Sequence, residues 1–211
     1  MKQIWQSLAY NYREGGIGQP VRKIALRLRD WFWSETAWLV YRVDLSGYTR
    51  EAALPLVRSE LGFDSMCEQG YFKARDFEAA TRARLDAGER CIGFFLGTDL
   101  VNVAWTTRGR LVLEAGLSLD DENCLGIFDC HTLPAYRSRG IYTDTLIRLL
   151  GLAREEGATV ALIAVDPGNR PSIKGIERAG FLPLFRLTLL RRLGRKSLQR
   201  SVFQPTYLTA T

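Results

Sequence analysis

The sequence of 211 residues lacks the features of several protein classes. It has a single histidine, His131, and four cysteines without a CxxC pair, which excludes a zinc site of the usual spacing. No apolar stretch reaches the roughly 18 uninterrupted residues of a membrane span. The first 35 residues are interrupted by basic side chains and lack the apolar region of a secretory signal. We therefore expect a cytoplasmic, reduced protein without a bound metal, in which the cysteines are buried thiols.

The composition is close to that of an average soluble domain. Hydrophobic residues make up 46% of the chain and charged residues 25%, which excludes a disordered, collagen-like or coiled-coil protein. The length fits one domain with a sizeable core and some additions. We expect a basic, aromatic N-terminal appendage at 1–34, the domain itself at 35–192, and a basic C-terminal extension at 193–211.

The net charge of +6 is unevenly distributed along the chain. Residues 167–211 contain nine basic side chains and one acidic one, whereas residues 1–34 contain six basic and two acidic ones. The middle of the chain is therefore negative. Positive ends indicate an anionic partner, such as a nucleotide-like phosphate, a membrane surface or nucleic acid, or else a solvated basic surface. Residues 20–33 could form a short basic amphipathic helix that docks on a membrane or a partner.

Hydrophobic patterns predict a chain of strands and helices. Strands are predicted at 36–45, 91–97, 100–106, 124–133, 159–165 and 181–190. Helices are predicted at about 50–61, 72–87, 140–156 and 170–179. A further apolar segment at 111–119 precedes a predicted turn at 120–123. From residue 124 onward the order is strand, helix, strand, helix, strand. We expect a right-handed parallel crossover there, with a ligand at the carboxyl ends of the two strands.

The turn that follows the strand at 124–133 has the features of an anion site. Residues 137–140, with the sequence RSRG, come just before the first turn of a helix, where backbone N–H groups have no intrahelical partner. A pyrophosphate fits such a site, because Gly140 allows close backbone approach while Arg137 and Arg139 add positive charge. An ordinary solvated loop can contain the same residues, so this turn is a weak signal by itself.

Two motifs together resemble those of the GCN5-related N-acetyltransferase (GNAT) family. The first, TLPAYRSRGIY at 132–142, resembles the acetyl-CoA loop of the family, Arg/Gln-x-x-Gly-x-Gly/Ala after a strand and a proline. It matches at Pro134, Tyr136, Arg137 and Gly140. The second, NRPSIKGIERAGF at 169–181, resembles the later motif of the family and fits it at Asn169, Ser172, Gly180 and Phe181. The interval between them has room for one helix and one strand, as the family requires.

The resemblance, which covers about residues 124–190, implies an α/β acyl-CoA N-acyltransferase fold with a central mixed β-sheet flanked by helices. It also implies acetyl-CoA as the cofactor. The residues that it assigns to acetyl-CoA are Cys130, His131, Thr132, Arg137, Ser138, Arg139, Gly140, Ile141, Tyr142, Thr143, Asn169 and Ser172. The backbone of 130–132 would pair with the pantetheine arm, residues 138–143 would surround the pyrophosphate, and Asn169 would hydrogen-bond the cofactor. The acceptor amine would enter from the opposite side.

Four positions depart from the family pattern. Tyr142 occupies the place of the last Gly or Ala of the loop, so its side chain must point away from the pyrophosphate or cover it. Ile176 occupies the place where many members have a tyrosine that protonates the leaving thiolate. Gly126 and Ala164 occupy the places at which the family has a glutamate base. The usual acid and base are therefore missing.

The catalytic candidates must come from the predicted site itself. Asp129 and His131 would share one face of a strand by its period of two, and Asp166 ends the neighbouring strand, so each is a candidate base. Tyr142 is the candidate acid, with Tyr136 as a second one. Each also has a structural alternative: a packed histidine, a turn-forming aspartate or a structural tyrosine. Cys130 is expected to be a buried thiol and not a nucleophile, because direct acetyl transfer needs none.

The resemblance implies transfer of an acetyl group from acetyl-CoA to a primary amine by direct attack, catalysed mainly by positioning. The same motifs resemble a bacterial subgroup linked to cell-surface polysaccharide assembly, which implies an amino-sugar acceptor. A polyamine, an antibiotic amine and a protein amine are alternatives. A second hypothesis, favoured by the missing acid and base, is a catalytically degenerate acyl-CoA-binding sensor or assembly module.

The charged ends bear on partners and location. Nucleic-acid binding through residues 186–200 is disfavoured, because this segment shows neither an aromatic reading platform nor a recognition helix. The basic ends suit contact with an anionic acceptor or with a membrane surface. We expect a cytoplasmic protein, at the inner face of the membrane if that contact forms, and a homodimer is compatible with the sequence.

Overall fold

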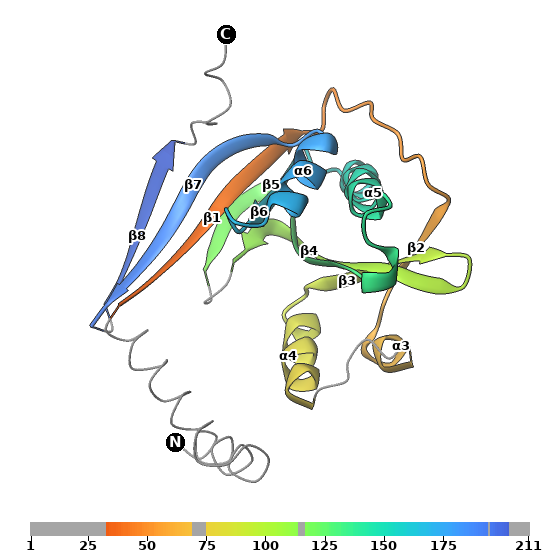
Figure 1. Ribbon diagram of the computed structural model, residues 1–211, viewed down its shortest axis with the longest axis horizontal. Coiled ribbons are helices and arrows are strands. Elements are labelled where there is room, and N and C mark those ends of the chain that lie inside the picture. The colour runs from red at the N-terminus through yellow and green to blue at the C-terminus, as the bar shows by residue number, and fades with distance from the viewer. Residues whose placement is uncertain (1–32, 69–74, 114–116, 194, 203–211) are drawn as a thin grey trace. The chain divides into compact units, whose positions relative to one another are not determined.

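The computed structural model describes residues 33–68, 75–113, 117–193 and 195–202, which contain both strands and helices (Figure 1). The strands are β1 (Trp33–Asp44), β2 (Leu56–Glu60), β3 (Arg90–Leu96), β4 (Asp99–Val112), β5 (Ser118–Thr132), β6 (Val160–Val165), β7 (Leu182–Arg192) and β8 (Arg195–Val202). The helices are α3 (Phe63–Glu68), α4 (Arg75–Asp86), α5 (Ile141–Glu155) and α6 (Arg170–Arg178), with a 3-10 turn at Pro134–Tyr136.

The strands form a mixed sheet in the order β2-β3-β4-β5-β6-β1-β7-β8. The β2–β3, β3–β4, β4–β5 and β1–β6 pairs are antiparallel, whereas β5 and β6 run parallel. Helix α5 connects the two parallel strands, so the predicted strand-helix-strand crossover is confirmed. The expected fold class, a mixed sheet flanked by helices, is confirmed as well.

The chain divides into two compact units. The larger unit contains residues 38–185 and therefore the whole predicted site. In the described residues the smaller unit contains 33–37 and 186–201. Within it, Arg186 lies 3.8 Å from the Glu35 carboxylate, and the Arg192 guanidinium lies 4.1 Å from the ring centre of Trp33. Residues 195–201 of β8 are exposed, so this basic strand has no packed face among the described residues.

In the larger unit, α5 and α6 lie on one side of the sheet, while α3 and α4 lie on the other (Figure 1). The apolar stripe of α5, including Leu146, Leu149 and Leu150, is fully buried with Ile176 and Phe181 in one hydrophobic cluster. Every fourth or third residue of α5 thus faces the sheet, as the sequence pattern predicted. The buried Asp144 of α5 accepts hydrogen bonds from the backbone N–H groups of Ala53 and Leu54, at 2.6 and 2.9 Å, and so ties the β1–β2 connection to the helix.

On the sheet side opposite α5, the backbone of β4 lies directly over Gly126. A Cβ atom at Gly126 would lie 2.1 Å from the Arg110 carbonyl oxygen and 2.7 Å from the Leu111 Cα. The β4–β5 pairing is irregular here, shifting between Arg108 and Arg110 around Gly109, whose φ is 75°. Only glycine fits at position 126, because any side chain would collide with backbone atoms.

Two predicted elements are wrong. Residues 50–61 were expected to be helical, but the structure has an extended segment followed by β2, which pairs with β3 in continuous register. Pro55 has no N–H to donate and disfavours a helical conformation in the residue before it, which explains the result. Residues 120–123, expected to be a turn, lie within β5, because the polar side chains there face solvent from an exposed strand. Helix α3 and strand β8 were not predicted.

Several predictions fall partly or wholly outside the described residues. The amphipathic helix expected at 20–33 lies outside them, except for Trp33, which begins β1. The helix expected at 72–87 is confirmed as α4 over its described part.

None of the helices in the described ranges is long and apolar enough to cross a bilayer. Of the cysteines, Cys91 and Cys124 are buried and Cys130 is partly buried, but Cys67 is exposed, so the prediction that all four are buried is wrong.

Candidate active site

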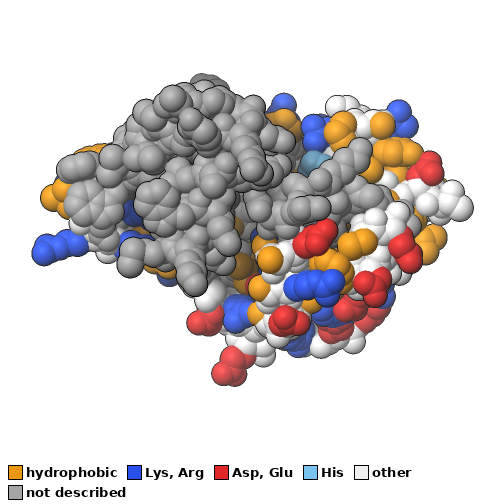
Figure 2. Space-filling view, turned by 90° about the horizontal axis from the view of Figure 1, so that it is seen from below, with side chains coloured by type: hydrophobic (Ala, Val, Ile, Leu, Met, Phe, Trp, Pro, Cys, Tyr) orange, Lys and Arg blue, Asp and Glu red, His pale blue; other side chains and the backbone are white. Residues whose placement is uncertain are grey.

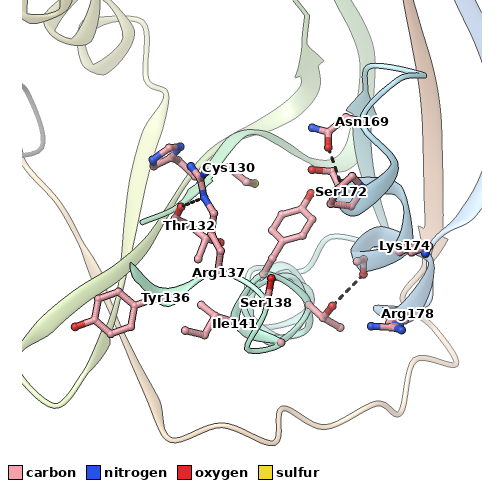
Figure 3. Close-up of a pocket in the computed structure, with 16 residues that line it drawn as sticks. Cys130, Thr132, Tyr136, Arg137, Ser138, Ile141, Asn169, Ser172, Lys174 and Arg178 are labelled. Carbon is pink, nitrogen blue, oxygen red and sulfur yellow. Dashed lines mark hydrogen bonds between the residues drawn. The ribbon is translucent and has the colours of Figure 1, made fainter. Parts of the chain in front are cut away.

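A cavity of about 760 Å³ lies at the junction of β5, the start of α5 and the start of α6 (Figure 3). It brings together all of the residues that the sequence assigned to the cofactor, except Arg139. The lining residues are Cys130, His131, Thr132, Tyr136, Arg137, Ser138, Gly140, Ile141, Tyr142, Thr143, Asn169, Pro171, Ser172, Lys174, Gly175 and Arg178. Arg139 lies outside this lining, with its guanidinium 5.6 Å from the ring centre of Tyr136.

The loop before α5 has the backbone conformation of an anion-binding nest. Gly140 is the N-cap residue of α5 with φ 78°, and Ser138, two residues earlier, has φ 61°. A positive φ turns successive peptide N–H groups toward a common side, and the first N–H groups of a helix have no intrahelical acceptor. No side chain caps α5 at this end. The positive end of the helix dipole and these N–H groups therefore favour an anion in the cavity.

The charges around the cavity also favour an anionic ligand. Among the described residues that line it, Arg137, Lys174 and Arg178 are basic and none is acidic. The Nε of Arg137 donates to the Thr132 carbonyl oxygen at 3.1 Å, which anchors this guanidinium to the end of β5. Lys174 and Arg178 are one helical turn apart on α6, so they share a face of that helix (Figure 3). Neither is among the residues that the family resemblance assigns to acetyl-CoA, although their spacing of four in the sequence predicts a shared helix face.

Strands β5 and β6 separate next to the cavity. Their parallel pairing ends at Ile127 and Ile163, yet β5 continues to Thr132. On its other edge β5 carries a bulge, because Asp129 and Cys130 together face the single residue Ala104 of β4. Asp129 has φ 48°, an uncommon conformation for a residue with a side chain. The end of β5 thus turns away from β6 and leaves its backbone edge open to an extended ligand.

Tyr142 fills the space between α5 and α6. A Cβ atom at Gly175 would lie only 2.5 Å from the Tyr142 Cδ1, so glycine at 175 makes room for the ring. The hydroxyl is hydrogen-bonded to Ser172, and burial raises the pKa of Tyr142 well above its ordinary value. The side chain therefore lies against α6 as a neutral phenol. Burial likewise raises the pKa of the neighbouring Cys130 thiol, which stays protonated and is a poor nucleophile.

Asn169 and Ile176 have local structural roles on α6. The Asn169 Oδ1 accepts a hydrogen bond from the Ser172 backbone N–H at 3.2 Å and caps the helix, which leaves the amide N–H₂ group available to a ligand. Ile176 is fully buried in the core. The position at which many family members have a tyrosine is therefore part of the hydrophobic core in this chain.

The candidate bases lie in different surroundings. His131 lines the cavity. Asp129 does not line it, because its bulge turns the carboxylate toward α4, where the Arg84 Nη1 lies 2.6 Å away. The bulge also interrupts the period of two that was expected to put Asp129 and His131 on one face. Asp166 accepts from the Gly168 backbone N–H at 2.6 Å in a turn outside the cavity lining.

The structure also shows the surroundings of Tyr136, the second candidate acid, and of Gly126 and Ala164, the two positions of the family base. The Tyr136 hydroxyl donates to Asp99 at 2.8 Å, and this hydrogen bond raises the pKa of Tyr136. Gly126 is covered by the Arg110 backbone, as described above. Ala164 pairs with Val40 of β1 in the sheet. Of the two family base positions, Gly126 therefore has a steric reason for lacking a side chain.

Comparisons with known proteins agree with this architecture. The family model described as the acetyltransferase (GNAT) family matches residues 27–181. Among solved structures, a GNAT acetyltransferase from Colwellia psychrerythraea has a TM-score of 0.53 at 16% identity, covering 74% of this chain and 55% of that one. A functionally unknown conserved protein from Staphylococcus epidermidis has a TM-score of 0.51 at 8% identity, with coverages of 80% and 66%. No curated protein matches the sequence.

A third structure, the GCN5-related glucosamine N-acetyltransferase region of a fungal multi-domain β-N-acetylglucosaminidase, has a TM-score of 0.57 at 13% identity. It covers 82% of this chain and 23% of that chain. At such identities these likenesses establish the fold alone. The chain spans 55% and 66% of the length of the Colwellia and Staphylococcus proteins.

Proposed function

Since this chain belongs to the acetyltransferase (GNAT) family, whose model matches residues 27–181, we propose that it transfers an acetyl group from acetyl-CoA to a primary amine. The observation that carries this proposal is the cavity at the end of β5, where β5 and β6 separate. It combines an open strand edge, a helix N-terminus with a positive-φ loop, and a lining with basic but no acidic side chains among the described residues.

The residues of the cavity fit acetyl-CoA. Ser138 and Gly140 shape the nest for the pyrophosphate, while Lys174 and Arg178 add positive charge. The backbone of 130–132 offers hydrogen bonds to the amide groups of an extended arm, and the Asn169 amide offers another. Bound acetyl-CoA supplies the acetyl group as a thioester, which is activated toward attack by an amine.

Two protons must leave an acceptor that arrives as an ammonium ion. As the C–N bond forms and the C–S bond breaks, one proton goes to a base and one to the departing thiolate. We assign the base to His131, because it is the candidate base that lines the cavity. We assign the donor to Tyr142, because this residue lines the cavity and its hydroxyl is protonated and hydrogen-bonded to Ser172. Asp129 and Asp166 remain weaker candidates, since their carboxylates already bind Arg84 and the Gly168 N–H.

For the acceptor we propose an amino sugar of a surface-polysaccharide precursor. Support comes from the resemblance of residues 137–142 and 169–181 to a bacterial subgroup associated with such assembly. We further propose a cytoplasmic enzyme that contacts the inner face of the membrane through its basic ends, and a homodimeric state. A polyamine, an antibiotic amine and a protein amine are the competing acceptors.

A catalytically degenerate acyl-CoA-binding module is the second candidate. Two observations favour it: the acid position holds the buried Ile176, and the base position Gly126 has no room for a side chain. This module would bind acetyl-CoA and transfer nothing.

A thiol-release assay with acetyl-CoA and a panel of amines separates the two candidates. The panel includes glucosamine, a nucleotide-linked amino sugar, spermidine and an aminoglycoside, and acetyl-CoA binding is measured by calorimetry. Amine-dependent thiol release supports the enzyme. Tight binding without release for any amine supports the degenerate module. Absence of acetyl-CoA binding contradicts both.

A further inference from the structure

On the side of β5 that faces α4, a cluster of side chains surrounds one guanidinium. The Arg84 guanidinium of α4 lies 5.1 Å from the ring centre of Trp105 and 5.7 Å from that of Phe128. Its Nη1 lies 2.6 Å from the Asp129 carboxylate, and its Nε lies 3.8 Å from the Glu89 carboxylate. We call these four partners of Arg84 the cation cage: Trp105, Phe128, Asp129 and Glu89.

The cage has the chemistry of a site for an organic cation. Aromatic faces and carboxylates are the two groups that attract ammonium and guanidinium ions in proteins. Trp105 and Phe128 are 2% and 8% exposed, so they offer a desolvated surface on which such an attraction is strengthened. Asp129 is half-exposed, which leaves the cage open to solvent on one side.

One cage atom lacks a hydrogen-bond partner, although it is buried. The Glu89 side chain is 9% exposed, and its Oε2 accepts no hydrogen bond, since the Arg84 Nε is too distant. Burial raises the pKa of Glu89, while Arg84 and Arg110 act in the opposite direction. A buried carboxylate oxygen without a donor is destabilising, so this oxygen has capacity for a further N–H group.

The cage adjoins, along β5, the residues that line the cofactor cavity. Asp129 directly precedes residues 130–132, which line the cofactor cavity, and the bulge turns its carboxylate toward α4. An amine held by Asp129 would therefore approach the end of β5 from the side opposite α5 and α6. Figure 2 looks at the molecule from the side of α3 and α4, where acidic and basic side chains intermingle on the surface that is not grey.

We propose that the cation cage binds the ammonium group of the acceptor and that Arg84 occupies it as an internal substitute until the acceptor arrives. This inference rests on the proposed acetyl transfer, for which it names the side chains that bind the acceptor. Acetylation converts the ammonium into a neutral amide. The cage would therefore hold the substrate and release the product.

The test compares two arginines of the same helix. Arg84→Ala empties the cage, whereas Arg82→Ala removes an equal charge from α4 at a guanidinium that stacks 3.5 Å from the ring centre of Phe63, outside the cage. Each full-length variant is titrated with ethylammonium chloride at constant ionic strength, and tryptophan indole N–H resonances are followed by NMR. N-ethylacetamide, the neutral acetylated counterpart, is the ligand control.

We expect Arg84→Ala to bind ethylammonium at least roughly tenfold more tightly than the parent protein and Arg82→Ala, a difference of about 1.4 kcal/mol. Adding Asp129→Asn should cancel this gain, and N-ethylacetamide should show no gain. Arg84→Gln, which keeps most of the aliphatic stem, replaces Arg84→Ala if that variant does not fold. Equal binding by the Arg84 and Arg82 variants overturns the inference.

The same variants separate this inference from the proposed function. If the protein transfers acetyl groups, the KM for the amine should fall in the Arg84 variant while the affinity for acetyl-CoA is unchanged. Ethylammonium binding without any acetyl transfer would retain the cage and reject the enzyme. Acetyl transfer with no difference between the two arginine variants would retain the enzyme and reject the cage.

Discussion

The two sides of the β5 end are built in different ways. The cofactor side is made largely of backbone: the open edge of residues 130–132, the positive-φ loop and the first turn of α5. The α4 side is made of side chains, namely the cation cage around Arg84. Backbone sites tolerate sequence change as long as the conformation is kept, whereas side-chain sites depend on each residue. The motifs that resemble the family pattern, at 132–142 and 169–181, both belong to the cofactor side.

The largest effect is expected from Gly126→Glu, which would restore the glutamate of the family pattern on the α4 side. The new Cβ would lie 2.1 Å from the Arg110 carbonyl oxygen, which is backbone and cannot move aside. We expect loss of the folded protein, measured by circular dichroism and soluble yield. The control is Gly151→Ala on α5, where nothing lies within 4 Å and where stability should be kept or rise by up to about 1 kcal/mol. A folded Gly126→Glu protein would show that the α4 side has room for a base.

The next largest effect is expected on the cofactor side from Gly140→Val. Gly140 and Gly157 lie just outside the two ends of α5, with φ of 78° and 74°, and a Cβ atom added at either position would have no neighbour within 4 Å. Valine at either position should cost roughly 1–2 kcal/mol of stability through backbone strain. Only Gly140→Val should also weaken acetyl-CoA binding, by at least roughly thirtyfold or about 2 kcal/mol in calorimetry. Equal acetyl-CoA affinities for the two variants would place the loop elsewhere.

A smaller effect on the same side is expected from Gly175→Ala. The added methyl group would lie 2.5 Å from the Tyr142 ring, so the ring must shift. Overpacking of this kind typically costs about 1–3 kcal/mol, measured by urea unfolding. Combining it with Tyr142→Ala, which restores the small residue of the family loop, should recover most of this loss. Additive effects in the double variant would show that the two residues do not share this space.

The smallest effect is expected on the α4 side from Glu89→Gln. Burial raises the pKa of Glu89 above its unfolded value near 4.5. The folded state therefore favours the protonated form, and the contribution of this group to stability is lost as pH rises through its folded pKa. We expect the unfolding free energy of Glu89→Gln to fall less between pH 4 and pH 7 than that of the parent. Glu122→Gln, on an exposed part of β5, is the control and should follow the parent.

Sequence patterns named in advance most of the residues that line the cavity, because these residues lie in short segments of the chain. The strand, the loop and the helix start that build it lie within residues 124–143, and Asn169 and Ser172 belong to one short motif. Where a prediction failed, a longer-range interaction decided the outcome. Residues 56–60 pair with β3 instead of forming a helix, and Asp120, which was expected to begin a turn, pairs with Arg110 of β4.

The sequence by itself determined the strand-helix-strand order, the glycine-containing turn before α5 and the absence of the usual acid and base residues, because each depends on residues close together in the chain. Only the tertiary structure decided that Gly126 has no room for a side chain, since the obstructing atoms belong to Arg110 and Leu111. It also decided that Asp129 turns toward Arg84, because a bulge against Ala104 interrupts the strand period. Contacts between distant segments and a one-residue bulge leave no periodic signal in a sequence, and here they shape the side of β5 that faces α4.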